Sequence, residues 1–366
     1  MTHSSFDHGR RISAARRLLG AAGIDALALS VGGDLPYLTG YEALLTERLT
    51  MLVLRTDGDG VLVVPRLEAP RVVPLPDLFG IRPWDETDDP LSVVVEELDG
   101  LDVVAVGDQT WAVFLLGMQQ ALPGTRFTSA APITRQLRMR KDANEISLLR
   151  AAAAATDRVV ERLAKTRFSG QTERQLAATV AEWALEEGHD TTGFAIVASG
   201  PNAASPHHSP SDRPIERGDT VVVDFGGRIG GYCSDTTRTF VVGDPSTAVE
   251  AAYRVLDEAQ RTGVETVRPG VQAGEVDAVT REVIDEAGLG DLFIHRTGHG
   301  IGLEVHEHPY IVAGNDTALE PGMAFSVEPG IYAPESWGMR IEDIVAVTSD
   351  GVDRLNQSDR RLYVVG

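Results

Sequence analysis

The sequence predicts an α/β domain followed by an α+β domain. The chain has 366 residues, which is long for one hydrophobic core, so two domains are expected. In the first third, helical patterns alternate with short apolar strands, whereas farther along the helices and the β-prone runs lie in separate blocks. A polar segment, RQLRMRKDANE, separates the two regions. We therefore expect a first domain at 1–134, a linker at 135–145 and a second domain at 146–366.

The first domain is expected to contain short elements. Ile12, Ala15 and Leu19 recur at helical spacing and predict an amphipathic helix at about 9–22. Apolar runs predict four strands and one further helix, at 26–30, 51–55, 60–64 and 102–106 for the strands and 91–98 for the helix. Residues that could ligate a metal do not cluster in this region. Its expected role is to oligomerise or to shape a site elsewhere.

The second domain begins with a strong helix signal. Asp142 followed by Glu145 is typical of a capping box, and Leu149, Ala153 and Val160 continue one apolar helical face. Further helices are expected at about 173–187 and 247–267, and β-prone runs lie at 193–198, 323–328 and 340–347. Separate blocks of helices and antiparallel strands indicate an α+β domain.

A predicted hairpin at 220–239, TVVVDFGGRIGGYCSDTTRT, carries two acids. A β-rich run reaches Asp224, paired glycines turn the chain, and a second run starts at Asp235. Two paired strands would bring these carboxylates together, where they repel unless a cation lies between them. A hard divalent metal is the obvious cation.

Composition excludes several classes of function. Asp and Glu outnumber Lys and Arg by 54 to 33, for a net charge of −21, and no basic cluster offsets this, so neither nucleic acid nor an anionic membrane is an expected partner. Cys233 is the only cysteine, so no intrachain disulfide can form. Charged residues interrupt any apolar export signal after the Arg10-Arg11 pair. A cytoplasmic protein is expected.

Further possible metal ligands follow the hairpin. Glu328 and Glu342 each lie in an apolar run, where an unpaired carboxylate costs several kcal/mol. Each residue also has an ordinary explanation when taken alone: Glu342 could pair with Arg340 on the same strand face, and a loop histidine is usually just hydrogen-bonded. The joint occurrence of these residues, in order, is what favours a metal site.

The ordered motifs resemble a known family. They are SGPNAASPHH at 199–208, VDFGGRIGGYCSDTTRTF at 223–240, HRTGHGIGLEVHEHP at 295–309, SVEPGIY at 326–332 and RIED at 340–343. From about residue 141 to 365 the chain resembles the pita-bread metallopeptidases, which include prolidase and aminopeptidase P. The preceding part, with PYLTGY at 36–41, resembles the creatinase-type N-terminal domain. The resemblance implies a creatinase-like α/β domain followed by a pita-bread catalytic domain.

The resemblance also implies site residues. The implied metal ligands are Asp224, Asp235, His299, Glu328 and Glu342. Asp235 and Glu342 would bridge two ions, Asp224 would complete one site, and the other two residues would complete the second. His207 and His306 match the family's catalytic histidines, with Glu328 as the proton carrier.

The donor chemistry agrees with this implication. Carboxylates with one imidazole suit Mn²⁺, the expected metal, with Co²⁺ and Zn²⁺ as alternatives. Two divalent ions lower the pKa of water for attack on an amide, Glu328 could carry its proton, and His207 and His306 could hydrogen-bond the developing oxyanion. The expected activity is hydrolysis of the peptide bond before proline.

Several functions remain open at this stage. A prolidase, that is an Xaa-Pro dipeptidase, is favoured over aminopeptidase P, which acts on longer peptides. Metal-free creatinase-like amidinohydrolysis and an inactive pita-bread binding protein are opposed by the presence of all five ligand residues. Methionine aminopeptidase usually lacks the extra N-terminal domain.

A dipeptidase needs an anchor for the free carboxylate of its substrate. Many prolidases carry an arginine after HE-x-P, whereas this chain has Tyr310 there. Arg340 and Arg48 are the other candidate substrate-binding residues. The family resemblance suggests a homodimer, in which the stretch containing Arg48 could close the neighbouring subunit's site and exclude longer peptides.

Overall fold

The computed structural model describes residues 6–366 and divides into two compact units, Met1–Arg138 and Met139–Gly366. The division falls inside the segment 135–145 that was expected to be a linker. Helix α5 (Ala131–Arg138) covers the first four residues of that segment, and helix α6 (Ala143–Leu163) covers the last three. The chain between the two helices is therefore only residues 139–142.

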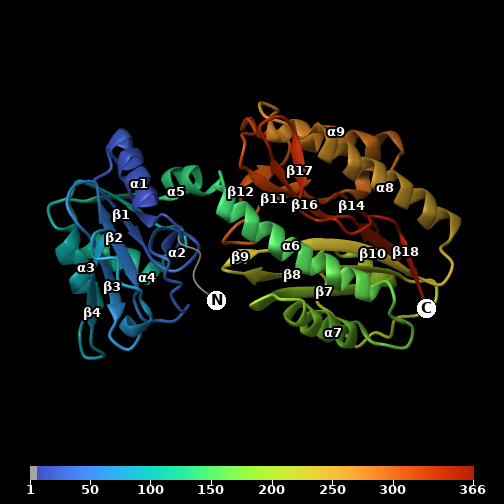
Figure 1. Cartoon of the computed structure of the whole chain (residues 1–366), viewed down its shortest axis with the longest axis horizontal. Coiled ribbons are helices and arrows are strands. Elements are labelled where there is room, and N and C mark those ends of the chain that lie inside the picture. Colours follow the sequence, from blue (N-terminus) through green and yellow to red (C-terminus); the bar gives the residue numbers. More distant parts are fainter. Residues whose placement is uncertain (1–5) are drawn as a thin grey trace. The chain divides into compact units, whose positions relative to one another are not determined.

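The first unit contains a six-stranded mixed sheet (Figure 1). The strand order is β4-β3-β2-β1-β5-β6. The strands are β1 (Ala26–Leu29), β2 (Met51–Arg55), β3 (Gly60–Pro65), β4 (Phe79–Trp84), β5 (Val103–Val106) and β6 (Arg126–Ser129). Strands β1, β2 and β3 pair antiparallel, and the pairs β1–β5, β5–β6 and β3–β4 are parallel.

Helices flank this sheet. They are α1 (His8–Ala22), α2 (Asp34–Thr39), α3 (Pro90–Leu98), α4 (Ala112–Ala121) and α5, with a short 3-10 turn η1 (Ala69–Arg71). Val94 and Leu98 of α3 and Met118 of α4 are buried against the sheet, and α1 contacts α2 and α5. All six predicted elements of this unit are confirmed. The strands β4 and β6 and the helices α2, α4 and α5 were not predicted, because their apolar patterns are short.

The second unit contains three sheets, whose strands are interleaved along the chain. Their strand orders are β18-β10-β8-β7 with β9 beside β8, β12-β11-β13-β16-β17, and β14-β15. The strands are β7 (Thr191–Ser199), β8 (Thr220–Ile229), β9 (Tyr232–Cys233), β10 (Thr236–Val242), β11 (Gly298–Gly300), β12 (Glu307–Ile311), β13 (Ala324–Val327), β14 (Gly330–Ala333), β15 (Trp337–Arg340), β16 (Asp343–Val347), β17 (Val352–Arg354) and β18 (Tyr363–Val365). Most neighbouring strands are antiparallel, as expected for an α+β domain.

Four long helices cover these sheets (Figure 1). They are α6, α7 (Glu173–Glu186), α8 (Thr247–Thr266) and α9 (Ala273–Glu286), with short turns η2 (Gly200–Ala204) and η3 (Gly290–Leu292). The predicted capping box at Asp142 and Glu145 is present at the start of α6. Helix α9 was not predicted. Within the described residues, no helix is long and apolar enough to cross a membrane.

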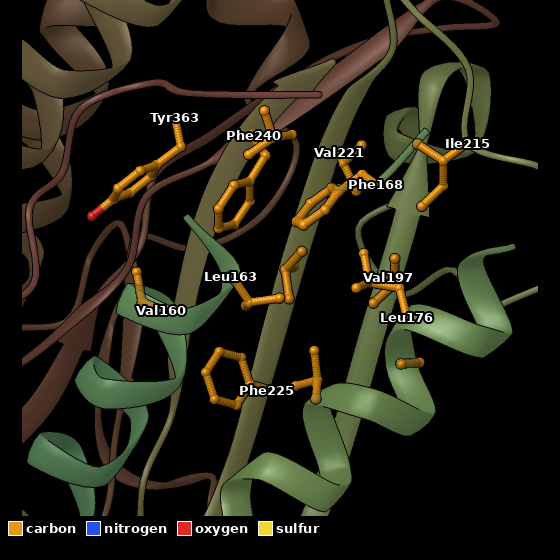
Figure 2. Packing of buried hydrophobic residues seen from close by; sticks show 14 of the residues in the cluster. Val160, Leu163, Phe168, Leu176, Val197, Ile215, Val221, Phe225, Phe240 and Tyr363 are labelled. Carbon is orange, nitrogen blue, oxygen red and sulfur yellow. The ribbon is translucent and has the colours of Figure 1, made fainter. Parts of the chain in front are cut away.

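A cluster of buried side chains packs α6 and α7 against the sheet of β7, β8, β10 and β18 (Figure 2). The rings of Phe168 and Phe240 lie 5.0 Å apart, and those of Phe240 and Tyr363 lie 5.1 Å apart. Leu163 of α6 and Leu176 of α7 belong to the same buried cluster. Fully burying side chains of this size stabilises the fold by roughly 1.5–3 kcal/mol each. This cluster gives β8 and β10 a rigid base.

The predicted hairpin is confirmed, with a tight turn. Ile229 pairs with Tyr232, and the two residues between them, Gly230 and Gly231, have φ angles of 57° and 85°. Two consecutive positive φ values match the type I′ turn of a two-residue hairpin, which glycine adopts without strain. Strand β10 then returns along β8, with Thr237 opposite Asp224.

The expected single strand at 340–347 is wrong. Strand β15 ends at Arg340 in the two-stranded sheet, and β16 begins at Asp343 in a different sheet. Glu342 therefore lies in the short connection between strands of two different sheets. Arg340 and Glu342 do not share a strand face.

Candidate metal centre

Five side chains converge from strands of the second unit. Asp224 lies in β8, and Asp235 directly precedes β10. His299 lies in β11, Glu328 directly follows β13, and Glu342 lies between β15 and β16. The two large sheets each contribute part of the cluster, and the crossing between sheets supplies Glu342.

The ligand atoms are close enough to share metal ions. One ligand atom from each of Asp224, Asp235 and Glu342 lies within 4.8 Å of the others, and the same holds for His299, Glu328 and Glu342. His299 Nε2 lies 3.1 Å from Glu328 Oε1 and 3.6 Å from Asp235 Oδ2. Glu342 belongs to both groups, so it is placed where a bridging ligand would be needed.

Burial and mutual repulsion shift the acids of this cluster. Burial first, and then the charges of Glu328 and Asp224, raise the pKa of Glu342 well above its usual range. Burial followed by the charges of Glu342 and Asp224 does the same to the pKa of Asp235. Such repulsion between buried carboxylates is relieved by a cation among them.

Two oxygens of the cluster lack protein partners. Asp224 Oδ1 and Glu342 Oε1 are buried, and neither has a hydrogen-bond partner within the described part of the chain. A buried acceptor without a partner costs roughly 1–3 kcal/mol. Orphaned carboxylate oxygens facing a cluster of acids are what divalent metal ions would satisfy. The donor set therefore fits metal ions on its own chemistry.

The ring of His299 is oriented for ligation. Its Nδ1 donates to the carbonyl oxygen of Gly300 at 3.1 Å, and its backbone N–H donates to Ser326 Oγ at 3.0 Å. In the neutral ring this arrangement puts the proton on Nδ1 and leaves the Nε2 lone pair facing the acids. Ser326 Oγ also donates to Glu328 Oε1 at 2.9 Å, so one hydroxyl aligns both residues.

Arg340 connects the two ends of the cluster. Its guanidinium donates to Asp224 Oδ2 at 2.6 Å and to Thr237 Oγ1 at 3.0 Å. Thr237 in turn donates to Glu342 Oε2 at 2.7 Å. The alternative pairing of Arg340 with Glu342 is wrong, because the chain bends between these residues and Arg340 reaches across to β8. Arg340 is 3% exposed and belongs to the framework that holds the acids.

The two histidines implied as catalytic lie at the edge of the cluster. The rings of His306 and His299 are 3.9 Å apart, and burial followed by His299 and Arg296 lowers the pKa of His306 to about 4. His207 follows the turn η2, its side chain is exposed, and its charge acts on the pKa of both His306 and His295. The ring of His306 therefore lies beside a ligand residue, and His207 is near enough for its charge to act on two other histidines.

The three substrate-binding candidates differ in position. Tyr310 is half-buried in β12, opposite His299 of β11. Arg340 is at the centre but engaged with Asp224. Arg48 belongs to the first unit, where it donates to Glu47 and Glu86 at 2.8 Å on an exposed surface. Of the three, Tyr310 and Arg340 therefore belong to the strands that carry the cluster, whereas Arg48 is paired with acids of the first unit.

Arg296 and Tyr332 contact residues of this site and were not singled out from the sequence. The guanidinium carbon of Arg296 lies 4.3 Å from the centre of the Tyr310 ring, and its Nη2 contacts His306 Nδ1 at 3.5 Å. The hydroxyl of Tyr332 accepts from Arg340 at 2.8 Å and contacts His295 Nε2 at 2.9 Å. Both residues stand inside the quoted motifs HRTGHG and SVEPGIY. The signal was present, but only the fold shows which neighbours they meet.

Comparisons with protein families match both units. Residues 11–140 match the Creatinase/Prolidase N-terminal domain, and residues 147–349 match Metallopeptidase family M24. The chain is 48% identical over 363 residues to "Probable dipeptidase PepE" of Mycobacterium tuberculosis, covering 98% of this chain and 96% of that protein.

Solved structures give the same result. A structure of dipeptidase PepE from Mycobacterium ulcerans matches with a TM-score of 0.92 and 47% identity, covering 99% of this chain and 100% of that chain. A structure of recombinant prolidase from Thermococcus sibiricus matches with a TM-score of 0.95 and 37% identity, with the same coverage.

Proposed function

This chain belongs to metallopeptidase family M24 and carries its creatinase/prolidase N-terminal domain, and from that premise we propose that it is an Xaa-Pro dipeptidase. The resemblance stated from the sequence motifs and the predicted fold class are confirmed. The proposed reaction is hydrolysis of the peptide bond before proline, by a homodimer in the cytoplasm. The observation that carries it is the buried cluster of four carboxylates and one imidazole with two orphaned oxygens.

We propose that this cluster holds two divalent ions per chain, Mn²⁺ first, with Co²⁺ and Zn²⁺ as alternatives. Asp235 and Glu342 would bridge, Asp224 would complete one ion's ligands, and His299 with Glu328 would complete the other's. Divalent ions bound in such a site lower the pKa of water and polarise a carbonyl group, which is the chemistry that amide hydrolysis needs.

The remaining steps belong to side chains of the protein. Burial alone would raise the pKa of Glu328, but the hydrogen bond and charge of His299 lower it to about 2, so the carboxylate is ionised and can accept a proton. Glu328 would then pass that proton to the leaving nitrogen. Arg296 donates weakly to His306 Nδ1, which leaves the proton of the neutral ring on Nε2, free to hydrogen-bond the developing oxyanion. His207 would provide a second donor.

Metal dependence is the first expected result. Protein treated with a chelator should lose hydrolysis of Xaa-Pro dipeptides, and about two equivalents of Mn²⁺ per chain should restore it. The melting temperature should rise on metal addition, because ions relieve the repulsion among the buried acids. Elemental analysis and thermal melts measure this. Full activity in metal-free protein would reject the proposal.

The carboxylate anchor separates a dipeptidase from an aminopeptidase P. Tyr310 stands where many prolidases have arginine, but the guanidinium of Arg296 lies over its ring and faces a neutral imidazole rather than an acid. Arg48 already holds Glu47 and Glu86, which makes it less available. We therefore propose Arg296 as the first candidate to bind the free carboxylate of a dipeptide, ahead of Arg48 from a neighbouring subunit.

Peptides that differ in length, or whose C-terminal carboxylate is amidated, test this assignment. Wild-type protein should prefer an Xaa-Pro dipeptide over both its C-terminal amide and an Xaa-Pro-Xaa tripeptide. Arg296→Gln should lower kcat/KM for the free dipeptide about 10- to 100-fold, because a charge-assisted hydrogen bond contributes roughly 1.5–3 kcal/mol, and should leave the amide nearly unchanged.

Arg48→Ala is the matched comparison. A selective loss in that variant alone would move the anchor to Arg48 and indicate a site completed by a second subunit. If wild-type protein prefers the tripeptide, the dipeptidase assignment fails and aminopeptidase P replaces it. An inactive binding protein would hydrolyse none of the three substrates.

A further inference from the structure

A buried glutamate outside the metal cluster binds the segment that carries His207. Glu173 is the first residue of α7 and is 0% exposed. Among the described residues, its two carboxylate oxygens accept hydrogen bonds only from residues 199–211, which we call the His207 segment. The donors are Ser199 N at 2.8 Å, Ser199 Oγ at 2.8 Å, Asn202 Nδ2 at 3.0 Å, His208 Nε2 at 3.0 Å, Ser211 N at 3.0 Å and Ser211 Oγ at 2.6 Å.

This carboxylate is stabilised in its charged form. Burial by itself would raise the pKa of Glu173, but the bonds from Ser211, Ser199 and Asn202 outweigh it and lower the pKa to about 2. The position at the N-terminus of α7 also favours an anion, because the first backbone N–H groups of a helix point toward it. Glu173 is thus a fixed acceptor set on a rigid helix.

The bonds reach both ends of the segment. Ser199 is the last residue of β7, and Ser211 lies beyond His207 and His208. The backbone also holds the far end, because the N–H group of Arg174 donates to the carbonyl oxygen of Ser211 at 3.0 Å. By closing both ends on one carboxylate, Glu173 restricts the loop that carries His207.

The opposite side of the segment rests on the strand that leads to the metal cluster. A Cβ atom at Gly338 of β15 would lie 1.8 Å from the carbonyl oxygen of Ala203, so glycine is needed there for the close approach. Arg340, at the end of the same strand, contacts the carbonyl oxygen of Pro206 at 3.5 Å. Pro206, the residue before His207, is therefore in contact with Arg340, which also binds Asp224.

We infer that Glu173 is a positioning residue for catalysis, which fixes the position of His207 through the His207 segment. The inference rests on the proposed function, because it gives His207 a part in turnover. His208, whose ring bonds to Glu173, is then a part of the support rather than a catalytic group. Side chains that orient a catalytic group in this way typically change activity 10- to 100-fold when removed.

A double-mutant cycle separates positioning from simple stabilisation. In Glu173→Gln an N–H group replaces one acceptor oxygen, so whichever way the amide turns, donors from one end of the segment face another donor. This variant should lower kcat/KM for an Xaa-Pro dipeptide about 10- to 100-fold with metal content unchanged. In a His207→Ala background the same change should lower it less than about twofold, because the residue through which it acts is gone.

Asp277 offers the matched structural control. It is a buried carboxylate on α9, and its Oδ1 accepts from Thr297 N at 3.0 Å and from Thr297 Oγ1 at 2.8 Å. Glu173 accepts the same pair of hydrogen bonds from Ser199. Asp277→Asn should therefore lower stability and activity in a similar way. Its effect should be the same with and without His207, because Thr297 lies in a different segment.

Hydrogen exchange tests the inference without any substrate. The backbone N–H groups of Ser199 and Ser211 should exchange faster in Glu173→Gln than in wild-type protein, and Asp277→Asn should leave them unchanged. If Glu173→Gln does not fold, Ser211→Ala removes one donor only and should give a smaller loss that again disappears in the His207→Ala background.

The outcomes distinguish this inference from the proposed function. Equal losses from Glu173→Gln in both backgrounds, or unchanged exchange at Ser199 and Ser211, would overturn the positioning role while leaving the dipeptidase assignment intact. Absence of Xaa-Pro hydrolysis in wild-type protein would reject the proposed function, and the exchange measurement would still decide whether Glu173 restrains the segment.

Discussion

Replacing Glu342 by alanine is expected to abolish hydrolysis and to remove bound metal. Glu342 is 1% exposed, belongs to two of the three groups of possible ligands, and has one oxygen without a partner among the described residues. Loss of an outer partner of a metal ligand costs roughly 10- to 100-fold, so loss of a bridging ligand itself should exceed this range. Asp235→Ala should behave in the same way. Metal content and kcat/KM measure the effect.

A more conservative variant gives a readout that does not depend on activity. Glu342→Gln keeps the size of the side chain and removes a buried charge that the neighbouring acids repel. Metal-free Glu342→Gln should therefore melt no lower than metal-free wild type, and the rise in melting temperature on adding Mn²⁺ should be small or absent. A normal metal-induced rise would exclude Glu342 as a bridge.

Asp343 is the control for this experiment. It is the next residue in the chain and equally buried, but its oxygens accept from Arg238 at 2.7 Å and Arg354 at 2.8 Å. Removing one partner of a buried ion pair costs about 3–5 kcal/mol. Asp343→Asn should lower the melting temperature with and without metal, and should keep the difference between the two states.

His306→Ala is expected to keep its metal and lose turnover. The ring lies beside His299, and loss of one donor to an oxyanion typically lowers kcat about 10²- to 10³-fold. KM should change little, because the interaction forms in the transition state. His306→Gln retains an N–H donor and should recover part of the loss. A His306→Ala enzyme with normal kcat/KM would remove this residue from the mechanism.

Local sequence patterns predicted most elements of the second unit because those elements are long or strongly marked. Helix α6 has a capping box and a continuous apolar face, and the hairpin of β8 and β9 has two glycines at its turn. Helix α9 was missed because it has no side-chain cap, and it begins with Ala273 and Gly274, which signal a helix weakly.

The predicted strand at 340–347 failed for a different reason. Its apolar residues are continuous, so nothing local indicates a break, yet Arg340 and Asp343 belong to two sheets. Glu342 lies at this break, where its buried side chain faces the other acids. A long-range requirement of the site therefore overrides the local preference for one strand.

What the sequence by itself determined is the kind of protein and its chemical groups. Five ordered motifs indicated the family and supplied the acids and histidines, and those groups were read directly from residue types. Only the tertiary structure decided which groups meet: Arg340 with Asp224, Arg296 with Tyr310, and Glu173 with the His207 segment. These partners are separated by 14 to 116 positions or come from different elements, and hydrogen bonds form by distance in space, which spacing along a chain does not encode.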